Sequence, residues 1–368
     1  AIYTLLLDMS VTAEIVGFVA MLHFIAGVFQ APFSGPIIDS MKPKKLMLIL
    51  IFVQIIATLC LVFINDLSDL NLLYVLIFIK MAAASFYFTT EMSLLPKILD
   101  GNKLQKANEL HSVIWSLSYT FGMALSGFIV YLLGVKVAFV LDAFMFIISF
   151  FLLYKLDIQV TLMKGSENFL EMMRDTFRYL NKFPHALHLM VVHAFVGLTA
   201  FDALVVLIVD EYYAGVIATS LAIGLLHASR ALGLVIGPII LGKWVNNKRI
   251  IYIFLFQALS VLLWAGLMKN FYLSLLASVV VGLFTTTLWS YTYTLLQKNI
   301  EEKYYGRIVA YNDMLFLGMA AFTSFMIGFL RSKDLALESI AIVIACGFIL
   351  GGIYYAWVIK TQNIKDIT

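Results

Sequence analysis

Five ionisable residues of this sequence stand inside otherwise apolar stretches. They are Lys80, Glu91, Asp142, Asp202 and Arg230. At the centre of a lipid bilayer such a side chain costs about 2.5 to 3.5 kcal/mol on insertion scales, so it needs a charged partner or a water-filled space. The chemistry open to these groups is proton transfer, reversible ion pairing and binding of a charged ligand group.

The first candidate pair is Lys80 with Asp202. Each lies about a third of the way along its apolar stretch from the same side, so a salt bridge that protonation or substrate breaks is expected. The alternatives are a permanent structural pair and a Lys80 that reaches to the membrane surface. Glu91 lies about three helical turns from Lys80, too far to pair with it. It is either a proton acceptor or part of a solvated helix end.

A second group of candidates surrounds residue 230. His227 and Arg230 are three residues apart and share one helix face. Arg230 is expected to contact an anionic substrate group or to pair with Asp202. His193 precedes Asp202 by nine residues, about 180° around a continuous helix, so both cannot face one cavity. Of these two, we favour Asp202.

Composition sets the class of protein that holds these groups. The 368 residues are 62% hydrophobic and 13% charged, against roughly 45–50% and about 25% in soluble domains. An ordinary soluble fold is excluded, and the net charge of +3 gives no reason to expect a nucleic-acid partner. The sequence has no phosphate-cradling glycine loop, metal-ligand spacing or nucleophile and base pattern. We therefore expect neither an enzyme nor a cofactor.

The apolar stretches predict an all-α polytopic membrane protein. Lipid requires internally hydrogen-bonded helices, each needs about 20 residues, and no stretch alternates with period two. A short apolar stub precedes the complete helices. The predicted spans are 14–34, 46–65, 71–94, 110–133, 135–154, 186–209, 216–242, 250–268, 271–296, 306–330 and 336–359.

Loop charges predict the orientation. Of the 25 basic residues, nineteen lie in or beside one alternate set of connections and the C-terminal tail, and four in the other set. The positive-inside rule then places the C-terminus and the long connection 155–185 in the cytoplasm. The expected location is the bacterial inner membrane. Apolar residues at helical spacing in this connection predict an amphipathic helix on the membrane surface, namely Phe169, Met172, Met173, Phe177 and Leu180.

The two halves of the chain repeat each other. Gly35–Ile38 recurs as Gly237–Ile240 at an offset of 202, and the Leu-Leu pair before Lys97 recurs before Lys298 at an offset of 201. Parallel repeats of this kind are a transporter architecture. We expect six-helix bundles at 1–154 and 186–368, joined by 155–185. The offset also predicts that about fifteen residues of a first helix precede this chain, for twelve helices in all.

One segment carries a family resemblance. Residues 35–45 resemble the loop motif between helices 2 and 3 of the major facilitator superfamily, with Asp39 and Lys44 at its acidic and basic positions. Ser40 replaces the usual arginine. The resemblance implies a cytoplasmic salt-bridge cluster that changes with conformation. Its expected members are Gly35, Asp39, Lys44, Arg307 and Asp313.

Further segments are similar to a narrower branch, the bacterial enterobactin exporters and macrolide efflux proteins. They include Leu94–Pro96, Ala107–Leu110, Gly122–Gly127, Phe139–Asp142 and Gly306–Ile308. Met123 and the pair Thr90–Glu91 depart from the pattern of this branch. Asp142 stands where the branch carries an aspartate, so its expected role is mainly structural, with ion coupling as the alternative.

The resemblance also implies that helices 1, 4, 7 and 10 line a central cavity. Lys80 and Glu91 on helix 4, and His193 and Asp202 on helix 7, then have priority as transport residues. Aromatic side chains near the cavity could stack on a flat or cationic ligand, although packing against helices or lipid is as common. These are Phe86, Tyr87, Trp115, Tyr119, Trp289 and Tyr293.

The function implied is secondary active transport. We expect a proton-coupled exporter of small amphipathic organic compounds of drug or siderophore type that works by alternating access as a monomer. Its partners are the small-molecule substrate, protons and the lipid bilayer. An importer or lysophospholipid flippase of the same fold is the first alternative. A non-transporting membrane sensor or assembly factor is the second.

Overall fold

A computed structural model describes residues 1–99, 101–158, 169–301, 304–362 and 364. All regular secondary structure in these ranges is helical. Ten segments are long and apolar enough to cross a membrane. One of them, Leu117–Lys155, contains two helices, so the described ranges hold the eleven spans that the sequence predicts. The chain is a multi-pass membrane protein.

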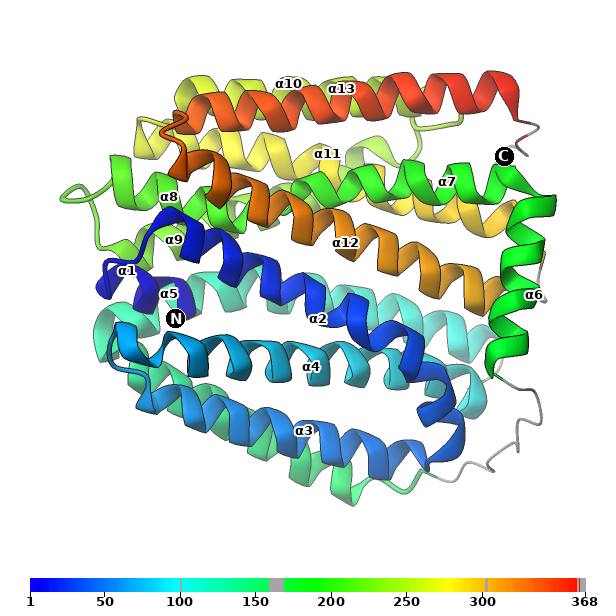
Figure 1. The fold of residues 1–368 in the computed structure, drawn as a ribbon, viewed down its shortest axis with the longest axis horizontal. Coiled ribbons are helices and arrows are strands. Elements are labelled where there is room, and N and C mark those ends of the chain that lie inside the picture. Colours follow the sequence, from blue (N-terminus) through cyan, green and yellow to red (C-terminus); the bar gives the residue numbers. More distant parts are fainter. Residues whose placement is uncertain (100, 159–168, 302–303, 363, 365–368) are drawn as a thin grey trace.

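The first half contains the α-helices α1 to α5 (Figure 1) and two short 3₁₀ turns, η1 (Leu61–Phe63) and η2 (Leu67–Asp69). The α-helices are α1 (Ile2–Asp8), α2 (Ala13–Ser40), α3 (Pro43–Cys60), α4 (Leu70–Ile98) and α5 (Gly101–Lys155). The break in α5 falls at Gly134, whose φ of 82° is left-handed backbone that a residue without a Cβ adopts at little cost. It lies where the sequence separates the spans 110–133 and 135–154.

The connection between the halves contains α6 (Phe169–Lys182). The helices of the second half are α7 (Pro184–Ala194), α8 (Asp202–Tyr212), α9 (Thr219–Leu241), α10 (Ile250–Leu267), α11 (Phe271–Lys298), α12 (Tyr305–Ser332) and α13 (Leu337–Thr361). Proline occupies the first helical position of α3 and of α7, where its missing N–H removes no intrahelical hydrogen bond.

The prediction of one continuous helix over 186–209 is wrong. The chain leaves the α-helix after Ala194, passes through a 3₁₀ turn, η3 (Phe195–Thr199), and resumes as α8 at Asp202. Gly197 in this turn lies directly on the backbone of α12, where a Cβ would come within 2.6 Å of the Phe316 carbonyl oxygen. The break therefore lies in a protein-packed part of the bundle, where irregular backbone is tolerated.

The two ends of the bundle differ in their connections (Figure 1). We call the end with the connections 41–42, 242–249 and 299–304 the basic end, and the other the opposite end. The C-terminal end of α13 and α6 lie at the basic end, and α6 runs across the other helices there. Its Tyr179 is buried and stacks on Tyr304 with ring centroids 4.2 Å apart, so α6 packs on the segment leading into α12.

Glycine contacts join the two halves. The halves meet where α2 packs on α12 and where α5 packs on α9. A Cβ on Gly328 would lie 2.7 Å from the Cα of Gly17, and a Cβ on Gly127 would lie 3.0 Å from the Cα of Gly224. Small residues allow helix backbones to approach this closely in membranes. Both glycine pairs lie in the part of the helices nearer the opposite end.

This geometry predicts that Gly328→Ala weakens the contact between α2 and α12. The added methyl group would meet Gly17 and the Ala13 carbonyl oxygen at 2.5 Å. Overpacking of this kind lowers the free energy of unfolding by about 1 to 3 kcal/mol. Thermal unfolding of the purified protein in detergent measures the effect.

Gly318→Ala is the matched control, because Gly318 lies on the same helix and a Cβ there meets no atom within 4 Å. This change should stabilise the helix by about 0.5 to 1 kcal/mol. Equal melting temperatures for the two variants would contradict the contact.

Candidate functional site

The break between α7 and α8 is held by an arginine from the neighbouring helix. The Thr199 carbonyl oxygen accepts hydrogen bonds from the Phe201 N–H at 2.8 Å and from Arg230 Nη2 at 2.7 Å. The Arg230 guanidinium also lies 5.0 Å from the centroid of the Phe201 ring, a cation–π contact. Arg230 thus gives the Thr199 carbonyl a second hydrogen bond, and this is the contact in which the structure places it.

Asp202 is the first residue of α8, directly after the break. Its Oδ1 lies 3.7 Å from Nε2 of His227, whose side chain is only 2% exposed. The Asp202 side chain is 20% exposed. A helix N-terminus favours a negative charge, so α8 stabilises the Asp202 carboxylate within the bundle. Within the described residues, His227 Nδ1 and Arg230 Nε are buried and have no hydrogen-bond partner.

Groups of the first half approach this cluster. Tyr119 of α5 and His23 of α2 both lie within electrostatic reach of Asp202. The ring of His23 stacks on Tyr3 of α1 with centroids 5.7 Å apart. The polar cluster around Asp202 therefore lies where the two halves meet.

Lys80 does not pair with Asp202. Its Nζ lies 2.6 Å from Asp142 Oδ2 and 5.4 Å from the centroid of the Phe146 ring, both on the second helix of α5. The prediction of a Lys80–Asp202 salt bridge is therefore wrong. Similar depth along two helices fixes height in the membrane, but not the direction in which a side chain points. Glu91 is half-buried on α4, about three turns from Lys80.

His193 is fully buried on α7. Its Nδ1 lies 2.8 Å from Thr292 Oγ1 of α11. The break lies between His193 and Asp202, so the two residues are not on one continuous helix. The 180° separation predicted for their side chains therefore does not apply. His193 and Asp202 occupy separate environments.

The residues of the loop-motif cluster are only partly described. Lys44 Nζ donates to the Leu156 carbonyl oxygen at 2.6 Å. Arg307 lies 3.7 Å from the Asp175 carboxylate of α6, and Asp313 accepts from Asn312 Nδ2 at 3.4 Å. Gly35 and Asp39 lie in α2, but their side chains are outside what the structure describes.

The candidate aromatic residues divide between the halves. Phe86 and Tyr87 are half-buried on α4 and pack beside α3. Tyr119 approaches the Asp202 cluster, and the side chain of Trp115 lies outside the described part. Trp289 and Tyr293 of α11 stack on each other with ring centroids 5.0 Å apart. Among the candidates whose side chains are described, the structure stacks Trp289 on Tyr293.

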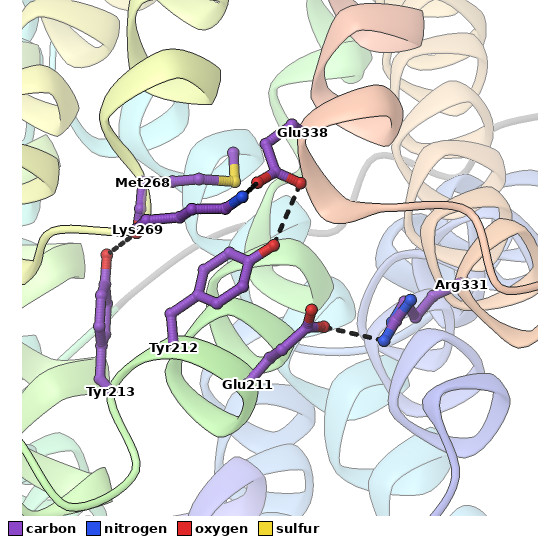
Figure 2. Close-up of polar contacts among 7 residues, drawn as sticks. All are labelled: Glu211, Tyr212, Tyr213, Met268, Lys269, Arg331 and Glu338. Atoms are coloured by element: carbon purple, nitrogen blue, oxygen red, sulfur yellow. Dashed lines mark hydrogen bonds and ion pairs between the residues drawn. The ribbon is translucent and has the colours of Figure 1, made fainter.

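Sequence reasoning missed a polar network at the opposite end (Figure 2). Glu211 pairs with Arg331 at 3.0 Å, and Glu338 pairs with Lys269 at 2.9 Å while accepting from the Tyr212 hydroxyl at 3.1 Å. The hydrogen bond to Glu338 raises the pKa of Lys269. The signal in the sequence is a set of oppositely charged residues at neighbouring helix ends. The network ties α8, α12, α13 and the α10–α11 turn together.

The chemistry of the site is that of protons and charges. Asp202 and His227 form a largely buried pair of titratable side chains 3.7 Å apart, and Lys80 and Asp142 form an ion pair at 2.6 Å. Among the described residues, no group of three or more His, Cys, Asp or Glu side chains could hold a metal ion.

Comparison with known proteins identifies the family. The sequence model of the Major Facilitator Superfamily matches residues 1–323. A curated relative, the uncharacterized MFS-type transporter YkuC of Bacillus subtilis, is 26% identical over 129 residues, which are 35% of this chain and 30% of that protein. The matched segment thus spans less than a third of the relative's length.

Solved structures share the fold. A variant of the nucleoside transporter NupG superposes with a TM-score of 0.74 at 12% identity, covering 97% of this chain and 93% of the other. A second NupG structure gives a TM-score of 0.70, also at 12% identity, covering 98% and 94%. The family match covers most of the chain and the fold agrees with it: the chain belongs to the Major Facilitator Superfamily.

Proposed function

We propose that this protein is a proton-coupled exporter of small amphipathic organic compounds in the bacterial inner membrane. The observation that carries the coupling is the Asp202–His227 pair, 3.7 Å apart at the break between α7 and α8. Intramembrane ionisable residues of this kind mark proton and substrate pathways. The direction rests on the sequence segments similar to enterobactin exporters and macrolide efflux proteins.

The proposed mechanism is alternating access by two rigid halves, residues 1–154 and 186–368. Protonation of the pair neutralises Asp202 or charges His227, and either change alters the interaction of α8 and α9 with the first half. The glycine contacts between the halves lie nearer the opposite end, which the loop charges assign to the extracellular side. Export requires these contacts to open.

Asp202→Asn should abolish coupling while keeping the fold. An amide preserves the shape of the side chain but does not accept a proton, so efflux driven by the proton gradient should fall at least about tenfold, as for loss of a group acting in general acid–base transfer. The measurement is ethidium and erythromycin accumulation in cells that express the protein, with and without a protonophore.

Asp210→Asn is the matched control, since Asp210 is an exposed carboxylate on the same helix. It should transport like the wild type. Normal efflux by Asp202→Asn would refute the coupling assignment. Accumulation unchanged by expression across a broad compound panel would refute export, and uptake of uridine in the same cells would favour the importer alternative.

We further propose that Arg307 changes partners during transport. In the structure it lies 3.7 Å from Asp175 of α6. The family resemblance implies an interaction with Asp39 of the loop motif. Arg307 would then bind Asp175 while the basic end is open and Asp39 while it is closed, so the two carboxylates compete for one guanidinium.

This competition predicts opposite shifts in two variants. Asp175→Asn should favour the closed basic end, and Asp39→Asn the open one. Distances between spin labels at Lys103→Cys and Lys298→Cys, two exposed basic-end positions, report the opening once Cys60 and Cys346 are replaced by serine.

Glu171→Gln, an exposed change on the same helix as Asp175, is the control and should leave the distances unchanged. If Asp175→Asn gives the same distance distribution as this control, Arg307 does not change partners.

A further inference from the structure

One side of α6 is held against the protein. Thr176, Tyr179 and Leu180 are buried. The Tyr179 hydroxyl accepts a hydrogen bond from the Glu301 N–H at 3.0 Å, while its ring stacks on Tyr304. Buried side chains spaced three and four residues apart lie on one helix face. These contacts therefore fix how α6 is turned about its own axis, and with it the direction of its other side.

The other side of α6 is basic. Arg174, Arg178 and Lys182 follow one another at intervals of four residues and are all exposed, so their side chains lie in one row along the helix. Among the described residues, none of these three side chains forms an ion pair. The exposed side also carries the acidic Glu171, whereas the Asp175 carboxylate is engaged by α12. Positive charge therefore predominates on the exposed side of α6.

α6 lies at the level where the membrane-spanning segments end. The preceding span ends at Lys155 and the next begins at Pro184, while α6 itself ends at Lys182. α6 runs across the other helices at the basic end (Figure 1). Its 14 residues, about 21 Å of helix, therefore follow the membrane surface. Phe177, which is 52% exposed, borders the basic row, and aromatic side chains of surface helices favour the boundary between headgroups and acyl chains.

We propose that the basic row of α6, Arg174, Arg178 and Lys182, binds the headgroups of anionic phospholipids. The loop charges assign the basic end to the cytoplasmic side, and anionic lipids of the cytoplasmic leaflet attract basic residues near its surface. Because α6 is already held by its buried side, little conformational freedom is lost when headgroups bind. Its place beside two span ends favours lipid over an acidic soluble protein as the occupant. The site is separate from the Asp202–His227 pair and does not depend on the proposed transport function.

The test measures which lipids surround α6. A bimane dye is attached at Asn181→Cys, an exposed position beside the row, after Cys60 and Cys346 are replaced by serine. The full chain is placed in phosphatidylcholine nanodiscs that contain increasing fractions of a nitroxide-labelled phosphatidylglycerol or phosphatidylcholine. Each basic residue near an anionic surface contributes about a fivefold preference. Half quenching should therefore need at least about fivefold less of the phosphatidylglycerol probe than of the phosphatidylcholine probe.

Removal of the basic row should remove this preference. In the variant that combines Arg174→Gln, Arg178→Gln and Lys182→Gln, the two probes should quench within about twofold of each other. The exchange Arg174→Lys, Arg178→Lys and Lys182→Arg keeps the charges and should keep the preference. All three side chains are exposed, so neither set of changes removes a buried contact of Tyr179.

The matched control removes three other positive charges from the basic end. Lys243→Gln, Lys248→Gln and Lys360→Gln change exposed positions in the 242–249 connection and near the end of α13. This combined variant should keep the preference for phosphatidylglycerol, because the row on α6 is intact.

The proposal is overturned if the two probes quench the unchanged protein equally, or if the control loses as much preference as the glutamine variant of the row. Loss of the preference in the charge-keeping exchange would also contradict it. Little quenching by either probe would place the basic row away from the bilayer, and an acidic soluble protein would then replace lipid as the expected occupant.

Discussion

The hydrogen bond from Arg230 to the Thr199 carbonyl allows the seventh crossing to be discontinuous. In lipid each backbone polar group needs a partner inside the protein, and the turn at 195–201 has left the regular helical pattern. The guanidinium and the Phe201 N–H both donate to the Thr199 carbonyl in this turn, and α8 begins directly after it with Asp202 at its N-terminus. His227, one turn before Arg230 on α9, is thereby brought to the carboxylate. The candidate coupling pair, Asp202 and His227, therefore lies beside the break that Arg230 contacts.

The two described pairs of ionisable side chains within the membrane each join residues of the same half. Lys80 and Asp142 belong to the first half, and Asp202 and His227 to the second. Two glycine pairs, Gly17 with Gly328 and Gly127 with Gly224, bring backbones of the two halves together. Parting the halves at these contacts therefore breaks no described ion pair in the membrane, and the desolvation cost of a broken buried pair does not arise. This arrangement is suited to the proposed movement of the two halves.

The amino-acid sequence was sufficient to predict the membrane-spanning helices. It was insufficient to predict which side chains contact one another. Span lengths and the separation at Gly134 follow from local hydrophobicity and one residue type, and both were predicted. The break at 195–201 was not, because that stretch is mostly apolar and contains no proline, and the packing of Gly197 on α12 depends on the fold. The partner predicted for Lys80 was wrong, because the depth of a residue in the membrane does not determine the direction in which its side chain points from the helix. The network around Glu338 and Glu211 joins four chain segments whose proximity only the fold establishes.

The left-handed residue Gly134 has a mechanical consequence. It alone connects the fifth crossing, which carries the Gly127 contact with α9, to the sixth, which carries Asp142. No loop is present to absorb a displacement between them. Any sliding of the fifth crossing along α9 must then carry the sixth with it, together with the Lys80 that Asp142 holds. The fifth and sixth crossings would then move together, and they connect the boundary between the halves to the Lys80–Asp142 ion pair inside the first half.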